Sequence, residues 1–368
     1  MIYLFILNYV YINFLFTIQR KKENNFQLIF FCFLIIFFVA FRFEVGGDWE
    51  SYKDNYQKIT NLGLFKGLIS YNSKFAVLIV HATKNFSILT ETLVLGVIYS
   101  FFYTKYLLST KSFFLSLYVT FPVFLFLVGL GYVHQGVAIT ICWQLLINYR
   151  TRTIKEIIAY VLLASLIHMS ALIFLYFVIP KFKNFKFFLK YIKNFFSKWV
   201  AVIFLILACL HLTGIDFFLD LFIDIRKKFL VYLFHDYYAS NGTLLRIFLF
   251  IPSLYIFKFI ELDFFKKKDN LELLNLLKCS LLLMFITLLI STIFRASILF
   301  AFVDRIFFCF IFFQVFVLNA YYQQYKLRDN ILIDLATYLF PFVYLLMWVF
   351  FSKYAPWWIP YKNILLNQ

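Results

Sequence analysis

Long apolar runs separated by short polar clusters make up almost the whole chain. A helix needs about 20 apolar residues to cross the hydrocarbon core of a bilayer, and most of these runs approach that length. The pattern therefore predicts an all-α, polytopic integral membrane protein with about ten transmembrane helices, plus re-entrant or broken ones. The predicted spans are residues 2–18, 26–41, 87–103, 112–128, 133–147, 199–215, 243–259, 273–294, 306–320 and 331–350.

The polar clusters between the runs give the expected orientation. Lys and Arg are enriched in cytoplasmic loops, so the clusters rich in them mark the cytoplasmic side. This rule places the N-terminus outside, together with the polar stretch that begins at Arg42, the turn at 129–131 and the C-terminal tail. The loops assigned to the cytoplasm are residues 19–25, 105–111, 150–155, 181–198, 261–270 and 326–328.

Three segments do not fit a simple crossing. Residues 156–180 lie between two basic loops, so they are expected to cross an even number of times. Two half-length helices that meet near His168 satisfy this, whereas a single ordinary span would invert every later segment. Residues 42–86 are expected to contain a mixed-charge loop followed by the apolar piece 75–81, which is too short to cross and is therefore expected to be re-entrant or interfacial. Aspartates spaced four residues apart in the loop 216–243 predict an amphipathic surface helix.

Composition supports the membrane assignment. Of the residues, 64% are hydrophobic and 14% are charged, with a mean hydropathy of +0.85, whereas soluble domains are nearer half apolar and a quarter charged. The net charge of +17 forms no stripe with interleaved base-reading residues, so no nucleic-acid partner is expected. The five cysteines lie singly in apolar segments, which indicates neither disulfides nor a metal centre. No linker or internal repeat divides the chain, and one domain covering residues 1–368 is expected.

The stretch from Arg42 to Tyr56 is dense in polar groups and begins directly where an apolar run ends. Its charges cannot lie in hydrocarbon unless they are satisfied, so it is expected at a membrane surface or in a wet cavity. The Gly46-Gly47 pair permits backbone conformations closed to other residues. Asp48, followed by aromatic rings, offers a charge and flat surfaces suited to a sugar. A solvated loop with a Gly-Gly turn is the alternative interpretation.

The orientation collects the unusual polar residues on the outer side, where ionisable groups near membrane depth tend to mark substrate pathways. A pocket with several cations and few carboxylates would attract a pyrophosphate headgroup, and Arg binds phosphate oxygens in pairs. Each residue also has a structural interpretation. Arg42 could reach lipid headgroups as a snorkelling side chain, and His168 could be a core histidine. Arg305 could pair with Asp304, and the His134-Gln135 pair could only cap the following helix.

Five short motifs follow one another along the chain: RFEVGGDWESY from Arg42, HQGVA from His134, ASLIHMSALI at 164–173, Arg-Ile from Arg305, and Pro-Tyr-Lys at 360–362. Their order resembles the signature of EpsG-type, Wzy-like polysaccharide polymerases, and the resemblance covers essentially the whole chain. In that family the second motif begins with Arg, where this chain has His134. The departure leaves open whether His134 or another cation does the work of that Arg.

The resemblance implies a glycosyltransferase of the bacterial inner membrane that acts on the periplasmic or exterior face. It would polymerise undecaprenyl-diphosphate-linked oligosaccharide repeat units of an O-antigen, capsule or exopolysaccharide. The growing chain would pass from one lipid carrier to a sugar hydroxyl of another lipid-linked unit. The expected partners are the lipid-linked donor and acceptor, membrane lipid and a chain-length regulator. Neither a cofactor nor a metal is expected.

The resemblance and the polar chemistry together assign roles to twelve residues. The departing diphosphate needs cations, and the acceptor hydroxyl needs a base. Asp48 and His168 are the candidate catalytic bases. The residues expected to bind the diphosphate are Arg42, Arg295, Arg305, His134 and Lys362. The residues expected to contact sugars are Trp49, Tyr52, Tyr132, Gln135 and Tyr361.

Three other functions remain open from the sequence. A flippase or another transporter usually shows internal repeats or paired broken helices, and only one broken element is indicated, near His168. A membrane O-acetyltransferase would also use a histidine that faces a cavity, and a cytoplasmic position for His168 would favour it. An O-antigen ligase is the third alternative, because the sequence separates it poorly from a polymerase.

Overall fold

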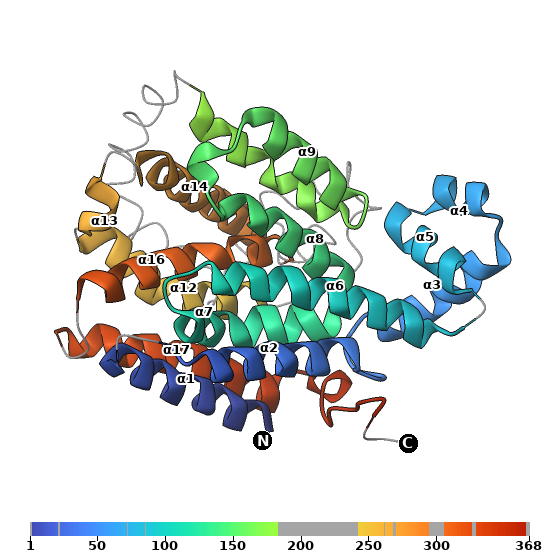
Figure 1. The fold of residues 1–368 in the computed structure, drawn as a ribbon, viewed down its shortest axis with the longest axis horizontal. Helices are drawn as coiled ribbons and strands as arrows, with labels where there is room; N and C mark the ends of the chain where they lie inside the picture. The colour runs from blue at the N-terminus through green and yellow to red at the C-terminus, as the bar shows by residue number, and fades with distance from the viewer. Residues whose placement is uncertain are drawn as a thin grey trace.

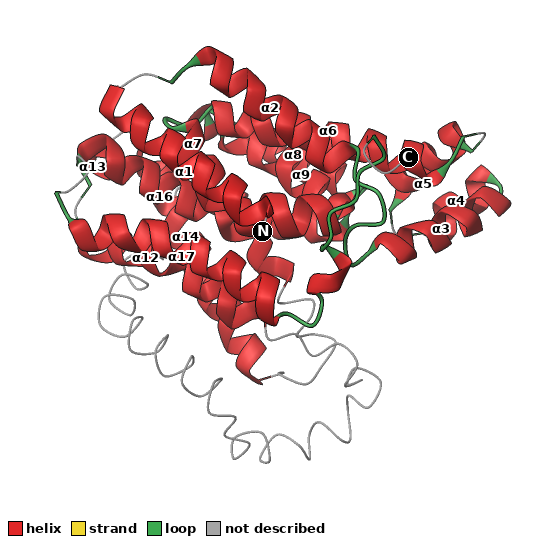
Figure 2. Ribbon diagram, turned by 90° about the horizontal axis from the view of Figure 1, so that it is seen from below, coloured by secondary structure: helices red, strands yellow, loops and turns green. Residues whose placement is uncertain are grey.

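The computed structural model describes residues 2–20, 23–71, 73–84, 86–182, 242–260, 262–267, 270–293, 305–325 and 329–365. Within these residues all regular elements are helical, which confirms the predicted class (Figures 1 and 2). The one strand-like pairing among them is an isolated antiparallel bridge between Arg42 and Asn363. The predicted span 199–215 lies outside the described residues, as does the aspartate-bearing part of the loop 216–243.

The described apolar runs form the helices of one bundle (Figure 1). Their bounds follow most of the predicted spans closely, and polar side chains cap the beginnings of α2, α6, α7 and α17. These helices are α1 (Ile2–Arg20), α2 (Asn25–Ala40), α6 (Ile88–Leu108), α7 (Phe113–Thr120), α8 (Val133–Trp143), α12 (Gly242–Phe259), α14 (Leu271–Ile293), α16 (Ile311–Gln324) and α17 (Ile331–Phe351), with the short α13 (Asp263–Lys266) before α14.

Two described helices, at Leu271–Leu289 and Ile331–Phe351, are long and apolar enough by themselves to cross a membrane. Several shorter apolar helices accompany them, among them the first two of the chain. The helical class is thus established for the described residues, while the count of about ten spans stays a prediction.

The segment from Phe113 to Gly129 lies at the centre of the bundle. It begins as α7 and continues as the π-helix η1 (Phe121–Gly129), and all of its residues are buried. A helix that is apolar on every side is stable only when other helices surround it. Here α1, α16 and α17 pack around it. The turn that follows η1 therefore has a fixed position relative to the rest of the bundle.

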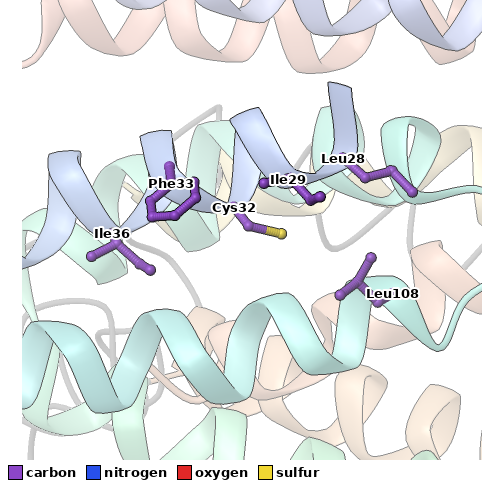
Figure 3. A pocket seen from close by; sticks show the side chains of 6 residues that line it. All are labelled: Leu28, Ile29, Cys32, Phe33, Ile36 and Leu108. Atoms are coloured by element: carbon purple, nitrogen blue, oxygen red, sulfur yellow. The ribbon is translucent and has the colours of Figure 1, made fainter. Parts of the chain in front are cut away.

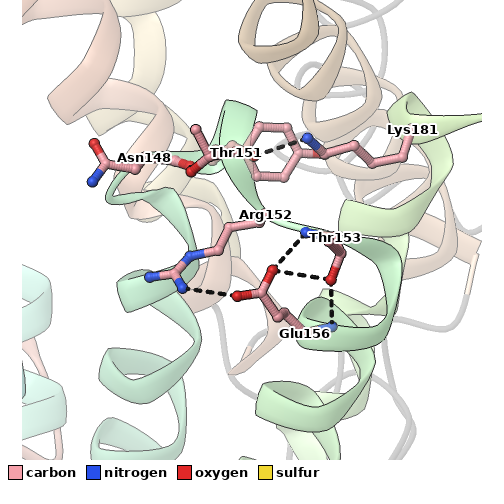
Figure 4. Close-up of polar contacts among 7 residues, drawn as sticks. Asn148, Thr151, Arg152, Thr153, Glu156 and Lys181 are labelled. Carbon is pink, nitrogen blue, oxygen red and sulfur yellow. Dashed lines mark hydrogen bonds and ion pairs between the residues drawn. The ribbon is translucent and has the colours of Figure 1, made fainter.

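The segment 156–180 is a helical hairpin, as predicted. The helix α9 (Ile154–Ser165) begins with a capping box between Thr153 and Glu156 (Figure 4). The chain then reverses at His168 into the 3-10 helix η4 (Met169–Lys181), which packs along α9. The ammonium of Lys181 donates to the carbonyls of Tyr149 (2.9 Å) and Arg150 (3.0 Å), so the hairpin returns to the end of the bundle from which it started.

The segment after Gly47 is helical, so the expectation of a mixed-charge loop was wrong. It forms α3 (Trp49–Asn61), α4 (Leu64–Ser70) and α5 (Lys74–Thr83), which project beside one end of the bundle (Figure 1). Trp49, Tyr52 and Ile59 recur on one face of α3 despite the many charges between them, and the apolar face of an amphipathic helix drives its packing. Ile59 joins Val77 and others in a small separate core. Residues 75–81, expected as a re-entrant or interfacial piece, belong to α5.

An apolar hollow of about 160 Å³ lies between α2 and α6 (Figure 3). Its walls carry no polar surface, so it offers no group for catalysis or for binding a charge. It lies toward the beginning of α2, whereas Arg42 follows the end of that helix. The lining residues are Leu28, Ile29, Cys32, Phe33, Ile36 and Leu108.

Candidate functional site

The loop after α2 and the C-terminal tail are joined by main-chain hydrogen bonds. The amide of Phe43 donates to the carbonyl of Lys362 (3.0 Å), and the amide of Gly46 donates to the carbonyl of Trp357 (2.7 Å). Ile364 donates back to the carbonyl of Phe41 (2.8 Å). These bonds satisfy backbone groups outside regular helices, and they place the first and last predicted motifs side by side.

Two glycines permit the close approach of these segments. Gly46 has a φ of 106°, and a Cβ atom there would lie 2.3 Å from the carbonyl oxygen of Leu130. A Cβ atom on Gly131 would lie 2.2 Å from the indole of Trp358, which is buried and donates to the carbonyl of Phe126. Any side chain at either position would push the loop, the 129–131 turn or the tail apart.

Arg42 is fully buried just after the end of α2. One guanidinium nitrogen, Nη1, donates to the carbonyl of Val39 (2.6 Å), while Nε and Nη2 have no hydrogen-bond partner. The alternative interpretation as a snorkelling side chain is wrong, because none of the residue is exposed. A buried cation with unused donors is costly unless charges nearby or a ligand compensate it. Glu91 and the hydroxyl of Tyr52 are among the groups that act on it electrostatically.

Glu91 is a site residue that the sequence reasoning missed. It lies in the first turn of α6 and is 3% exposed. Its Oε1 atom is 3.6 Å from Nε2 of His134, and its Oε2 atom has no hydrogen-bond partner. The signal was a carboxylate inside an apolar run, since ionisable residues in such runs usually serve a function.

Tyr52, from α3, links this buried group to the outer part of the site. Its ring lies over the imidazole of His134, with 4.7 Å between the ring centres. Its hydroxyl interacts electrostatically with Asp48, Arg42 and Arg305. Tyr52 therefore contacts His134 from the side of the α3–α5 segment.

Asp48 and Arg305 form an ion pair with 3.6 Å between Oδ1 and Nη2. Asp48 occupies the position before α3 but makes no capping hydrogen bond, so its carboxylate remains directed to Arg305. Burial raises the pKa of Asp48, and the Arg305 guanidinium and the Tyr52 hydroxyl oppose that rise. Asp304, the alternative partner predicted for Arg305, lies outside the described residues.

Arg305 is also held by the start of α8 and the residue that precedes it. Its guanidinium lies 4.8 Å from the centre of the Tyr132 ring, and its carbonyl accepts a hydrogen bond from Gln135 (3.1 Å). These contacts join two motifs that are 170 residues apart. An aromatic ring under a guanidinium fixes its plane while leaving its N–H groups available in that plane.

His168 lies at the turn of the α9–η4 hairpin, where its Nδ1 accepts from the amide of Ser170 (3.2 Å) and contacts the Ser170 hydroxyl (2.8 Å). An amide only donates, so Nδ1 is the acceptor and the neutral ring carries its proton on Nε2. His168 interacts electrostatically with Arg305 and His134. It therefore belongs with them to one group of side chains, called the Arg42 cluster, whose members are Arg42, Asp48, Tyr52, Glu91, His134, His168 and Arg305. With its one acceptor nitrogen occupied, the imidazole is a donor here and a poor base.

The remaining predicted residues lie at the edge of the cluster. Lys362 pairs with Glu44 (2.7 Å), and the Tyr361 hydroxyl donates to the carbonyl of Phe38 (2.9 Å). Trp49 is buried with its ring edge-on to Phe43, so it presents no open face to a sugar. Arg295 lies outside the described residues.

The charge balance differs from the expectation of several cations with few carboxylates. Among the described residues, Glu91 lies near Arg42, Asp48 pairs with Arg305, and Glu44 pairs with Lys362. One further cation, Arg246 of α12, is buried and lies over the Phe308 ring, which in turn stacks on Tyr132. Its sequence signal was a lone Arg within an apolar run.

No three His, Cys, Asp or Glu side chains within the described ranges are grouped in a way that could hold a metal ion. The groups that the cluster does offer are guanidinium and amide donors, two carboxylates and aromatic rings. Such groups bind anions and hydroxyl-rich molecules.

In a comparison with protein-family models the chain matches the model described as the EpsG family over residues 25–363. The match covers nearly the whole chain and includes every residue of the cluster. No curated protein and no solved structure matches the chain.

Proposed function

The chain belongs to the EpsG family of Wzy-like polysaccharide polymerases, and its apolar helices agree with a membrane protein. From that premise we propose that it joins undecaprenyl-diphosphate-linked oligosaccharide repeat units on the outer face of a bacterial inner membrane. Membership of the family supports a role in polysaccharide polymerisation. The proposal adds the identity of the lipid carrier and the face of the membrane.

The observation that carries the proposal is the buried guanidinium of Arg42, which has two unused donor nitrogens. Arg42 and Arg305 both interact electrostatically with the Tyr52 hydroxyl, so both cations lie near this hydroxyl. A diphosphate that leaves an anomeric carbon gains negative charge, and donors already in position stabilise it without reorganisation. Arg suits this task because it binds two phosphate oxygens at once.

In the proposed step, the oxygen of the acceptor hydroxyl forms a bond to the anomeric carbon of the donor sugar. The bond between that carbon and the diphosphate oxygen breaks, and the electron pair leaves with undecaprenyl diphosphate. Asp48 takes the proton of the hydroxyl. We prefer Asp48 to His168 as the base, because the acceptor nitrogen of His168 is occupied by Ser170.

Access to Arg42 requires a movement, because its guanidinium is enclosed in this conformation. Tyr52 belongs to α3, and α3 to α5 share a small core of their own. We propose that the lipid-linked substrate displaces Tyr52 and takes its place beside Arg42. The Asp48–Arg305 pair, which is partly exposed, would open in the same movement.

The test uses a strain that lacks this protein and is complemented with variants. Arg42→Ala is expected to lower polymerisation on the order of 100-fold, because it removes donors aimed at the transition state. The glycan should then carry a single repeat unit, while Arg42→Lys should keep part of the activity through its charge. The matched control is Lys53→Ala, an exposed cation on α3, which should give the full ladder of chain lengths.

Immunoblots of the membranes must show equal amounts of each protein. A full ladder from Arg42→Ala at normal abundance would remove the diphosphate role. In the strain without the protein, loss of every repeat unit would favour a ligase or flippase. Unchanged chain length with missing acetyl groups would favour an acetyltransferase.

A further inference from the structure

The short helix α4 has three distinct sides, and only one of them is packed against the protein. Gly67 is buried against Val77, where a Cβ atom would lie 2.9 Å from Cγ1, and Leu68 packs on the same small core. Phe65 and Ile69 are instead 79% and 82% exposed. Residues four apart in a helix lie on one face, so these two side chains form an apolar flank of α4.

The third side of α4 is polar. Lys66 and Ser70 are also four residues apart and exposed, and they lie on the flank away from Ile69. A helix with an apolar flank and a basic flank is typical of one that lies in the plane of a membrane interface. With seven residues, α4 is about 10 Å long, so it can lie along a bilayer surface but cannot cross it.

The charge of the whole α3–α5 segment favours an anionic lipid surface. Residues 49–86 contain five lysines and two carboxylates, and a basic segment beside a membrane is attracted to anionic headgroups. A lysine can lay its apolar stem along the interface and keep its ammonium among the headgroups. These residues are Lys53, Lys58, Lys66, Lys74 and Lys84, with Glu50 and Asp54.

The apolar flank lies near surface that the membrane assignment already places in lipid. The amide of Phe75, at the start of α5, donates to the carbonyl of Leu166 at the tip of the α9–η4 hairpin (3.1 Å). Leu166 and Met169 at this tip are about half exposed, as expected of lipid-facing residues of the bundle. Figure 1 shows α4 at the edge of the α3–α5 segment, beside this end of the bundle.

We infer that the α3–α5 segment docks on the bilayer surface through Phe65 and Ile69, with anionic phospholipid as its partner. The docking requires the bundle to lie in a membrane but does not depend on the proposed reaction. Because α3 shares its core with α4 and α5, docking also holds Tyr52, which contacts His134, at the level of the lipid headgroups.

The experiment places a single cysteine at Ile69 in the cysteine-free, full-length protein and labels it with a nitrobenzoxadiazole fluorophore. The protein is reconstituted in nanodiscs of phosphatidylcholine and phosphatidylglycerol, with or without lipid that carries a nitroxide near the top of its acyl chain. Interfacial helices lie about 5–10 Å into the headgroup region, so the label should emit at shorter wavelength and lose about half of its intensity to the nitroxide.

The matched control is a cysteine at Ser70, exposed on the polar flank of the same helix, whose label should keep most of its emission. Discs of phosphatidylcholine alone should quench the label at residue 69 less, because the lysines lose their anionic partners. Equal quenching in both kinds of disc would overturn the assignment of anionic lipid as the partner.

A label at residue 69 that emits as in water and is not quenched would overturn the docking. The proposed reaction would then still stand, because neither cysteine variant alters the Arg42 cluster. Conversely, a full ladder from Arg42→Ala would remove the diphosphate role and leave the docking unaffected.

A second measurement decides the question if the cysteine-free protein does not fold. The photoreactive residue p-benzoylphenylalanine replaces Phe65 in the otherwise unchanged chain, and cells are irradiated before the protein is purified. The expected adduct has the mass of a phospholipid. Cross-linking to another protein, or no lipid adduct, would overturn the inference.

Discussion

At the scale of single residues, the cluster brings together cationic and acidic groups that are largely removed from solvent. Arg42 is charged and enclosed, Glu91 is a carboxylate inside an apolar helix, and Asp48 is partly buried beside Arg305. Each of these would be costly alone, and together they compensate one another. Perturbed titratable groups that converge in one place are typical of functional sites.

The pH dependence of polymerisation tests the role of Asp48. A base acts only when deprotonated, and burial raises the pKa of Asp48 above its ordinary 3.8. The midpoint of the acid limb of the pH–activity profile is therefore expected above pH 3.8. Arg305 lowers this pKa, so Arg305→Gln should move the acid side to still higher pH.

The measurement is polymerisation in membrane vesicles over a pH series. Asp48→Asn should abolish activity at every pH, and Lys53→Ala should leave the profile unchanged. An acid side that moves to lower pH in Arg305→Gln would exclude Asp48 as the base.

At the scale of elements, the site depends on three segments that meet without regular structure between them. The loop after α2, the 129–131 turn and the C-terminal tail contact one another through glycine and main-chain atoms. The α9–η4 hairpin adds His168 from a fourth direction. Because these segments come from different parts of the chain, the site can form only when the bundle has assembled.

Gly46→Ala tests this dependence. The new methyl group would lie 2.3 Å from a carbonyl oxygen at a φ of 106°, so the loop must shift or strain. We expect a destabilisation on the order of 2 kcal/mol and a lower melting temperature of the purified protein. The control is Gly63→Ala, where nothing lies within 4 Å of the new atom and the φ of −66° suits any residue. Equal melting temperatures of the two variants would show that the close approach does not matter.

At the scale of the whole molecule, polar contacts concentrate at two ends of the bundle. One end holds the Arg42 cluster. At the other, Glu23 accepts from the amide of Phe113 (2.7 Å), and Asn319 accepts from the amide of Ser112 (2.8 Å). Loops that the charge rule assigned to opposite sides of the membrane thus lie at opposite ends.

Thiol labelling tests the orientation in a cysteine-free background. Single cysteines at Lys53, Lys353 and Met169, all exposed, should react with an impermeant reagent added outside intact cells. A cysteine at the exposed Lys111 should react only after the membrane is opened. Labelling at Lys111 from outside would invert the orientation, and labelling at Met169 only from inside would favour the acetyltransferase alternative.

The amino-acid sequence by itself determined the helical class, the bounds of most helices, the hairpin around His168 and the end of the bundle at which the motifs meet. Hydropathy and charge determine these features because they act locally along the chain. The sequence also led to errors, among them the loop in place of α3, because the charges of that segment obscured the apolar face that buries Trp49.

Only the tertiary structure decided which side chains are enclosed and what they contact. Arg42 is buried where the C-terminal tail pairs with it at Asn363, and Glu91 has a partner because α8 brings His134 beside it. Asp48 meets Arg305 across more than half of the chain. Burial and pairing depend on how distant helices pack, and the pattern along any one helix does not contain that information.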